Sequence, residues 1–153
     1  MIKAIEILSP LGAVTILEKE EKICGVYFAP LSSFEAKSEE TPLLLKAKKE
    51  LLEYFSGKRT DFDLPLSLKG TEFQLKVWEK LKTIPYGETR TYQEIAQMIG
   101  CPKGCRAVGM ANHKNPICIL IPCHRVVGKN GALTGYAGGL SRKEWLLKRE
   151  KSL

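Results

Sequence analysis

The stretch TYQEIAQMIGCPKGCRAVG, residues 91–109, decides the architecture of the second half of the chain. Thr91 and Glu94 match a capping box, in which a threonine and a glutamate three residues later satisfy the free N–H groups that open a helix. We expect this helix to end at Gly100, and Pro102 is a suitable first residue for the next helix. Two helices joined by so short a turn predict a helix-turn-helix.

The second helix of this pair is poor in bulky side chains. Arg106 lies near its start and is followed by Ala107, Gly109 and Ala111. Small side chains fit an ordinary pair of closely packed helices. They also fit a helix whose backbone approaches DNA closely, with Arg106 directed at the duplex. Helix spacing alone favours the packed pair.

The distribution of charge bears on this choice. Residues 1–70 contain ten Lys and Arg against eleven Asp and Glu, which gives a net charge of −1. Residues 71–153 contain fourteen against six, which gives +8. A basic half attached to a nearly neutral half favours a polyanionic partner, most simply nucleic acid, over an ordinary lysine-rich surface.

Composition and cysteine usage indicate the compartment. Lys3 and Glu6 interrupt the apolar residues at the start of the chain, so no signal-peptide core forms, and no apolar run has the length of a membrane span. Five cysteines are an odd number, which fits a reducing compartment with a free thiol in use. We therefore expect a cytoplasmic protein with no membrane partner, and we also expect a monomer.

The first half of the chain alternates apolar and polar residues in short runs. Met1–Leu8, Val14–Glu18 and Ile23–Phe28 have the period of half-buried strands and are separated by turn residues. Pro42–Phe55 has the spacing of an amphipathic helix, and Gly57 is its expected stop. This half predicts a small antiparallel sheet with one helix.

The character of the sequence changes at Lys69-Gly70, after a last extended segment at Asp61–Leu68. Beyond it, capping boxes at Thr71 and Ser141 predict two more helices, the first ending near Leu81. The predicted domains are residues 1–68 and residues 71–153. The predicted fold class is α+β, with an N-terminal sheet-plus-helix domain followed by a mostly helical domain that contains a winged helix-turn-helix.

The chemistry of the chain centres on Cys123. A thiolate is a strong nucleophile, and a neighbouring base or cation favours its formation. Here Pro122 precedes the cysteine and His124 and Arg125 follow it. The apolar run Ile117–Ile121 predicts a buried strand that ends at this site. A lone cysteine is more often a small buried apolar residue, but these neighbours favour a nucleophile.

A nucleophilic thiol needs a base and a group that orients the base. In a strand the side chains of Cys123 and His124 would diverge, so a direct bond needs a bend or a bridging water. The orienting carboxylate is expected on the last helix, at Glu144 or Glu150, and sequence spacing does not choose between them. Asn115 begins the approach to the cysteine, where it fits a turn residue or a brace.

Several motifs, in this order and at compatible spacing, resemble those of the O6-alkylguanine-DNA alkyltransferases. The resemblance covers roughly residues 71–150, and its Pro-Cys-His-Arg core is highly specific, whereas the N-terminal part matches only as a small strand-and-helix domain. The motifs are Tyr92-Gln93-Glu94-Ile95-Ala96, Arg106-Ala107-Val108-Gly109, Asn115-Pro116, Ile121-Pro122-Cys123-His124-Arg125-Val126, Gly138-Gly139-Leu140 and Lys143-Glu144-Trp145-Leu146-Leu147.

The resemblance implies DNA repair by direct reversal, in which Cys123 accepts the alkyl group of O6-alkylguanine in double-stranded DNA, once and irreversibly, without metal or organic cofactor. It implies that His124 removes the thiol proton through water and that Glu150, rather than Glu144, holds the histidine. Asn115 is implied to brace the active-site turn, and Tyr92 to stand beside the extruded base and protonate the departing guanine.

The remaining roles implied by the resemblance concern DNA and the base. Arg106 is expected to fill the gap that the extruded nucleotide leaves in the duplex. The other expected DNA contacts are Tyr92, Ala107, Gly109 and Arg125. The expected wall of the guanine pocket consists of Tyr136, Ala137 and Gly138, with Lys143 as a nearby support.

Two departures and two alternatives qualify this interpretation. Residues 1–70 contain only Cys24 and no histidine, so the zinc site of some family members is absent, and Cys123 stands where a related non-transferring group has tryptophan.

A winged-helix regulator with an alkylation- or redox-sensing cysteine shares the charge and the helix-turn-helix. It does not explain why Asn, His and Glu should converge on the thiol.

The second alternative is a zinc site. It would draw on Cys101, Cys105, Cys118 and Cys123, with His113 or His124, but only one close cysteine pair is present. Abundant Lys and Glu with few Asn and Gln lean towards a thermophile, a source compatible with a Cys101–Cys105 disulfide, although the sequence does not predict one.

Overall fold

The computed structural model describes residues 1–152 and separates into two compact units. The first unit is Met1–Leu68 together with Pro116–Leu120, and the second is Lys69–Asn115 together with Ile121–Leu153. The predicted division after residue 68 thus assigned Pro116–Leu120 to the second domain, whereas this segment packs in the first unit. Leu153, the end of the predicted second domain, lies outside the described residues.

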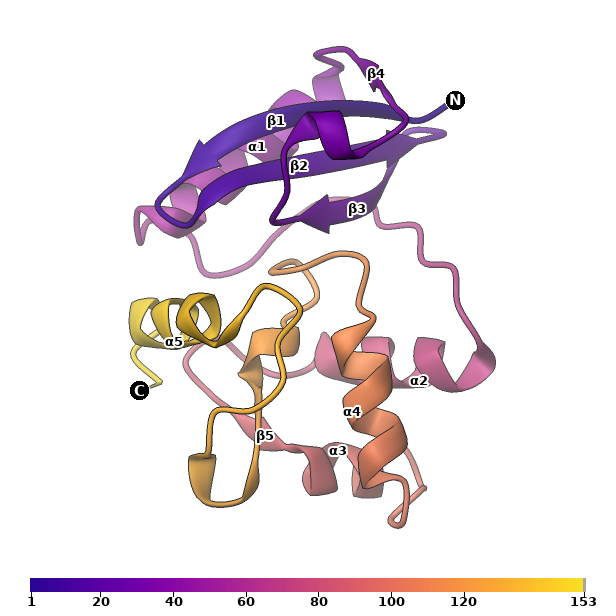
Figure 1. Ribbon diagram of the computed structural model, residues 1–153, viewed down its shortest axis with the longest axis vertical. Helices are drawn as coiled ribbons and strands as arrows, with labels where there is room; N and C mark the ends of the chain where they lie inside the picture. Colours follow the sequence, from indigo (N-terminus) through magenta and orange to yellow (C-terminus); the bar gives the residue numbers. More distant parts are fainter. Residues whose placement is uncertain (153) are drawn as a thin grey trace. The chain divides into compact units, whose positions relative to one another are not determined.

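The first unit is built on a four-stranded sheet in the order β3-β2-β1-β4 (Figure 1). Its strands are β1 (Lys3–Ser9), β2 (Gly12–Lys19), β3 (Lys22–Tyr27) and β4 (Lys37–Ser38). The three strands expected from alternation are confirmed, and β1, β2 and β3 pair antiparallel. The short β4, which was not predicted, pairs parallel with β1 at the edge of this otherwise antiparallel sheet.

The single long helix of this unit, α1 (Pro42–Phe55), has the predicted bounds. Thr41 caps it by accepting a hydrogen bond from the Leu44 N–H at 3.0 Å, and Pro42 occupies its first turn, where no N–H is needed. One face of α1 is buried against the sheet through Leu44, Ala47, Leu51, Tyr54 and Phe55. Gly57, at φ +81°, follows the end of the helix as expected.

The returning segment Pro116–Leu120 is not the strand that its apolar sequence predicted. A single parallel bridge joins Ile117 to Val26 of β3. The chain then turns tightly at Ile119, whose φ is +72°, with the Leu120 N–H donating to the Cys118 carbonyl at 2.8 Å. The expectation failed because an apolar run has no periodicity that distinguishes a strand from a buried irregular segment. Asp61–Leu68 likewise forms only one bridge, between Leu66 and Ile23.

The second unit is mostly helical. Capping boxes at Thr71 and Thr91 are both present as predicted, with each threonine and the residue three positions later exchanging hydrogen bonds. Its regular elements are α2 (Glu72–Leu81), β5 (Arg90–Thr91), α3 (Tyr92–Met98), α4 (Cys105–His113), β6 (Val126–Val127) and α5 (Leu140–Arg149). This confirms the α+β class, with a sheet-plus-helix unit and a helical unit.

Two helix starts in this unit differ from prediction. Helix α4 begins at Cys105, with Gly104 as its N-cap, so Pro102 lies in the turn and not in the helix. Helix α5 begins at Leu140 after Gly139, whose φ of +94° favours glycine, and Ser141 makes no capping hydrogen bond. Both misplacements arose because a proline or serine near a helix start is a permissive signal and does not fix the first residue.

Helices α3 and α4 pack together, as the helix-turn-helix pattern predicted. Helix α2 packs against α4, and its Trp78 donates the indole N–H to the Ala111 carbonyl at 2.8 Å. The parallel pair of β5 and β6 joins Arg90 to Val126 and Thr91 to Val127. This pairing fixes the start of α3 beside the segment that follows Cys123. Among the described residues, no helix is long and apolar enough to cross a membrane.

Candidate active site at Cys123

A tight turn at Pro122 places Cys123. The Cys123 N–H donates to the Ile121 carbonyl at 2.7 Å, and Pro122 has φ −78° and ψ 63°, the conformation of an inverse γ-turn. Cys123 then opens a single 3₁₀ turn, Cys123–Arg125. The nucleophile candidate is therefore held by backbone hydrogen bonds on a short rigid element, and only 2% of it is exposed.

Two buried asparagine amides at the end of α4 hold this turn. Asn115 Nδ2 donates to the Ile121 carbonyl at 2.8 Å, and Asn112 Nδ2 donates to the Cys123 carbonyl at 3.3 Å. Asn115 thus sits where a brace is needed. Asn112 was not anticipated, although its spacing from Val108 places it on the buried face of the predicted helix, where a polar residue calls for a partner.

His124 and Glu150 form a fully buried pair. The His124 Nε2 lies 2.7 Å from the Glu150 Oε2. If the carboxylate is ionised, Nε2 must carry the proton and donate it, which leaves Nδ1 with its lone pair free to accept one. Among residues 1–152, His124 Nδ1 has no hydrogen-bond partner. The ring therefore has one nitrogen held by the carboxylate and one available as a base.

Burial and hydrogen bonding set the charge of this pair. Burial lowers the pKa of His124 below its ordinary 6.5 and outweighs the hydrogen bond to Glu150 and the charge of that carboxylate, which raise it, so the ring is neutral at neutral pH. Burial on its own would raise the pKa of Glu150, but the hydrogen bonds and charges of His124 and Arg125 outweigh it and lower that pKa to about 2. A neutral imidazole beside an ionised carboxylate is the arrangement of a general base.

Arg125 completes the buried cluster. Its Nε donates to Glu150 Oε1 at 2.7 Å and its Nη2 to Glu150 Oε2 at 3.0 Å, while Nη1 donates to the Ile84 carbonyl at 2.7 Å. The expected DNA contact of Arg125 is therefore wrong for this structure, because the guanidinium is buried and its donors are engaged. Local sequence patterns do not reveal this contact, because the partner lies 25 residues further along the chain.

Tyr92 and Lys143 meet at a loop that follows the site. Tyr92 Oη donates to the Thr134 carbonyl at 3.0 Å. Lys143 Nζ is buried and donates to the Val126 carbonyl at 2.5 Å and the Thr134 carbonyl at 2.6 Å. Burial lowers the pKa of Lys143 to about 8, although the nearby Cys123 opposes this by raising it. Burial also raises the pKa of Tyr92, so its phenol keeps its proton at neutral pH.

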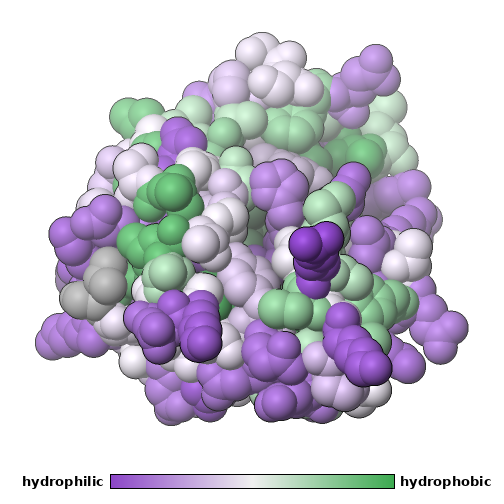
Figure 2. Space-filling view, turned by 60° about the horizontal axis from the view of Figure 1, so that its bottom comes forward, coloured by the Kyte–Doolittle hydropathy of each residue, from purple (hydrophilic) through white to green (hydrophobic). Residues whose placement is uncertain are grey.

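The other expected residues divide between surface and interior. Arg106 and Ala107 are exposed on α4, and Gly109 faces the Tyr92 ring, which would lie 3.9 Å from a methyl group added to this glycine. Of the expected pocket wall, Tyr136 is buried, whereas Ala137 is exposed. Figure 2 shows one face of the molecule, on which hydrophilic side chains surround separate hydrophobic patches.

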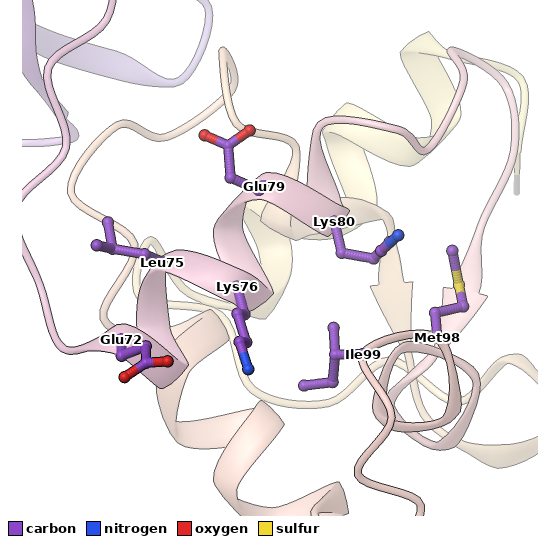
Figure 3. Close-up of a pocket in the computed structure, with 7 residues that line it drawn as sticks. All are labelled: Glu72, Leu75, Lys76, Glu79, Lys80, Met98 and Ile99. Atoms are coloured by element: carbon purple, nitrogen blue, oxygen red, sulfur yellow. The ribbon is translucent and has the colours of Figure 1, made fainter.

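A hollow of about 490 Å³ between α2 and the end of α3 is a separate feature (Figure 3). Its lining consists of Glu72, Leu75, Lys76, Glu79, Lys80, Met98 and Ile99. It contains neither a thiol nor an imidazole and none of the residues of the Cys123 cluster. Among residues 1–152 there is also no group of three or more His, Cys, Asp or Glu side chains placed to hold a metal ion.

Comparison with known proteins bears directly on this site. Residues 72–152 match the DNA-binding domain of 6-O-methylguanine DNA methyltransferase, and residues 5–68 match the ribonuclease-like domain of the same protein. The chain belongs to the 6-O-methylguanine DNA methyltransferase family.

Relatives match along almost the whole chain. The constitutive methylated-DNA–protein-cysteine methyltransferase of Bacillus subtilis (strain 168) is 48% identical over 151 residues, covering 94% of this chain and 92% of the relative. The corresponding methyltransferase of Methanosarcina acetivorans is 49% identical over 148 residues, covering 94% of this chain and 95% of the relative.

Solved structures of the family agree with the fold. The Mycobacterium tuberculosis O6-methylguanine methyltransferase is 44% identical and superposes with a TM-score of 0.90, covering 99% of this chain and 94% of that one. M. tuberculosis OGT in complex with DNA is 45% identical with a TM-score of 0.88, covering 99% and 92%. Membership of the 6-O-methylguanine DNA methyltransferase family explains why a buried thiol, a base and a carboxylate share one unit with a helix-turn-helix.

Proposed function

We propose that this chain repairs DNA by direct reversal, transferring the alkyl group of O6-alkylguanine in double-stranded DNA to the Sγ of its own Cys123. The observation that carries the proposal is the buried His124–Glu150 pair, whose free Nδ1 belongs to the residue that follows the thiol. Membership of the methyltransferase family supports the same reaction, and nothing in the comparisons favours a transcriptional regulator.

The proposed step balances without a cofactor. His124 Nδ1 accepts the Cys123 proton through a water molecule, and the thiolate attacks the alkyl carbon. The new S–C bond forms as the C–O bond to guanine breaks, and the departing guanine takes a proton from Tyr92. The thioether product has no good leaving group, so each molecule acts once.

Access to the alkyl carbon requires extrusion of the nucleotide, which costs about a few kcal/mol. The exposed Arg106, early in α4, is the proposed residue that fills the resulting gap, and Ala107 and Gly109 let the helix approach the duplex. In free protein the Tyr92 hydroxyl is bonded to the Thr134 carbonyl, so it must exchange this partner for the base. Tyr136, Ala137 and Gly138 form the proposed wall of the base pocket, with Lys143 anchoring the loop.

The proposal also covers the way the protein binds DNA, its oligomeric state and its location. The +8 charge of residues 71–153 supports phosphate-driven binding that is indifferent to sequence and falls steeply with salt. We propose a monomer that acts in the cytoplasm, where a free thiol is kept reduced.

Intact mass after incubation with duplex DNA that contains O6-methylguanine tests the function. We expect a gain of one methyl group, about 14 Da, located on Cys123 by peptide mapping. The Cys123→Ser variant should gain nothing, whereas Cys118→Ser, the matched change at the other buried cysteine, should still be methylated. An unchanged mass together with tight binding to one operator-like sequence would favour the regulator instead.

A further inference from the structure

Two cysteines flank the turn between α3 and α4, outside the cluster around Cys123. Cys101 is exposed, and Cys105, the first residue of α4, is half-buried. The Gly104 N–H donates to the Cys101 carbonyl at 2.8 Å, which closes the turn. A methyl group added to Gly104 would lie 2.8 Å from Cys101 Sγ. The Cys101 sulfur is therefore folded back over the residue that immediately precedes Cys105.

We propose that Cys101 and Cys105 form a dithiol site that is converted reversibly into a disulfide by low-molecular-weight disulfides such as oxidised glutathione. The exposed Cys101 thiolate attacks the small disulfide, forms a mixed disulfide and releases one small thiol. The Cys105 thiolate then attacks Cys101 Sγ, closes the protein disulfide and releases the second small thiol. Two protein thiols are oxidised and one small disulfide is reduced to two thiols.

The surroundings favour this pair over the two buried cysteines. Cys118 and Cys123 are buried, which hinders attack on an external disulfide. Lys103 lies between the two thiols and Arg106 follows them, and both are exposed, so an anionic disulfide is attracted to the turn. Gly104, which lies between the two cysteines in the sequence, has no side chain to crowd Cys101 Sγ.

Closure of the disulfide acts on the helix that we propose to enter DNA, so this consequence rests on the proposed function. The turn is tied to α3 because Gln93 Nε2 donates to the Pro102 carbonyl at 2.8 Å. Drawing Cys101 Sγ onto Cys105 tightens the turn against that tether and shifts the first turn of α4, which carries Arg106. Oxidation should therefore slow transfer from duplex DNA about tenfold, because a small misplacement of a positioning group is costly, and leave transfer from free O6-alkylguanine unchanged.

The experiment equilibrates unalkylated full-length protein in glutathione buffers of increasing oxidised-to-reduced ratio. Intact mass should fall by about 2 Da, and dithiothreitol should reverse the change. Trypsin cleaves after Lys103, so the peptide that ends there should remain linked to the peptide that begins at Gly104 only in oxidised protein. The variants Cys101→Ser and Cys105→Ser should each abolish this link, and Cys118→Ser should retain it.

Two results would overturn the proposal. The first is the absence of a Cys101–Cys105 link at every glutathione ratio, or a link that joins other cysteines. The second is an equal loss of rate on duplex and free base, which would place the effect at the thiol acceptor and not at α4. Because the peptide link is measured without any alkyl transfer, failure of the proposed function would not be mistaken for failure of the dithiol site.

Discussion

Glu50 in the first unit and Glu150 in the second are both buried, and the partners of these two carboxylates differ. Glu50 on α1 of the first unit accepts a hydrogen bond from the Asp63 N–H at 2.9 Å and pairs with Lys46 at 3.6 Å and Arg59 at 3.8 Å. The side chains of these two cations are 48% and 28% exposed. Glu50 therefore ties a surface loop to a helix through partners that water can replace.

Glu150, in the second unit, has partners that water cannot replace. The side chains of His124 and Arg125 are 0% and 8% exposed, and each makes a contact of 2.7 Å with the carboxylate. A buried ion pair is costly to break because its surviving member keeps a charge in a medium of low polarity. A buried glutamate thus holds a surface loop against a helix in one unit and forms the charged centre of a reactive cluster in the other.

The largest contrast is expected in stability. Arg125→Met removes three donors from a buried site and takes away the buried cation that pairs with Glu150, which should lower the free energy of unfolding by about 3–5 kcal/mol. Arg59→Met is the matched change at a partner of Glu50. It should change the free energy of unfolding by no more than about the experimental error, because Arg59 is partly exposed. Urea unfolding of both variants makes the comparison. Equal losses would show that exposure of the cation is not what separates the two sites.

The second contrast lies in the response to acid. Glu150 has a folded pKa of about 2 against an ordinary value of 4.5, so the stability it confers is present above 4.5 and lost as pH falls towards 2. The loss over this interval should amount to about 3 kcal/mol. His124, with a folded pKa below 6.5, adds a loss in the same direction that begins at higher pH.

Unfolding measured between about pH 6.5 and pH 2.5 tests this contrast. Glu150→Gln should reduce the loss of unfolding free energy at acid pH, because the group that titrates differently in the folded and unfolded chains is gone. Glu50→Gln is the control variant. If Glu150→Gln lost as much unfolding free energy at acid pH as the unmodified protein, other groups would be responsible for the acid sensitivity.

The third contrast is in alkyl transfer. Glu150→Gln leaves His124 without an anion that fixes its Nε2 proton and supports the positive charge that the ring acquires, so the single-turnover rate should fall about 100-fold. Glu50→Gln should leave the rate unchanged. DNA affinity should be nearly unchanged in both, since both side chains are buried. If Glu150→Gln transferred at the normal rate at neutral pH, Glu150 would not be the orienting group.

The contrast between the units also shows what the sequence can predict. The helix Pro42–Phe55 and the capping boxes at Thr71 and Thr91 were found because their signals lie within one helical turn. The first three strands were found because alternation and turn residues are equally local. Elements of this kind occur in both units, and they make up most of the scaffold.

The site itself depends on contacts that local patterns do not contain. The turn at Pro122 replaced an expected strand end because two buried asparagines and a backbone hydrogen bond stabilise it. Arg125 was expected to contact DNA, and its burial is explained by Glu150 and the Ile84 carbonyl, which lie far from it in the sequence. The pairing of His124 with Glu150 itself came from the family resemblance, since spacing left Glu144 equally open.

The smallest and most selective effect is expected at the surface of α4. Arg106→Ala should slow transfer from duplex DNA several-fold, because filling the gap left by the nucleotide offsets part of the unstacking cost. It should barely change transfer from free O6-alkylguanine, which needs no extrusion. Lys49→Ala, at a cation on α1 of the first unit, should change neither rate.

Tyr92→Phe provides the complementary test within the second unit, because protonation of the leaving guanine is common to both substrates and both rates should fall together. Single-turnover rates with the two substrates, measured for all three variants, separate the roles. Equal losses on duplex and free base for Arg106→Ala would mean that this arginine takes no part in extrusion. A duplex-specific loss for Lys49→Ala would mean that the first unit also contacts DNA, and the division of labour between a scaffold unit and a reactive unit would then fail.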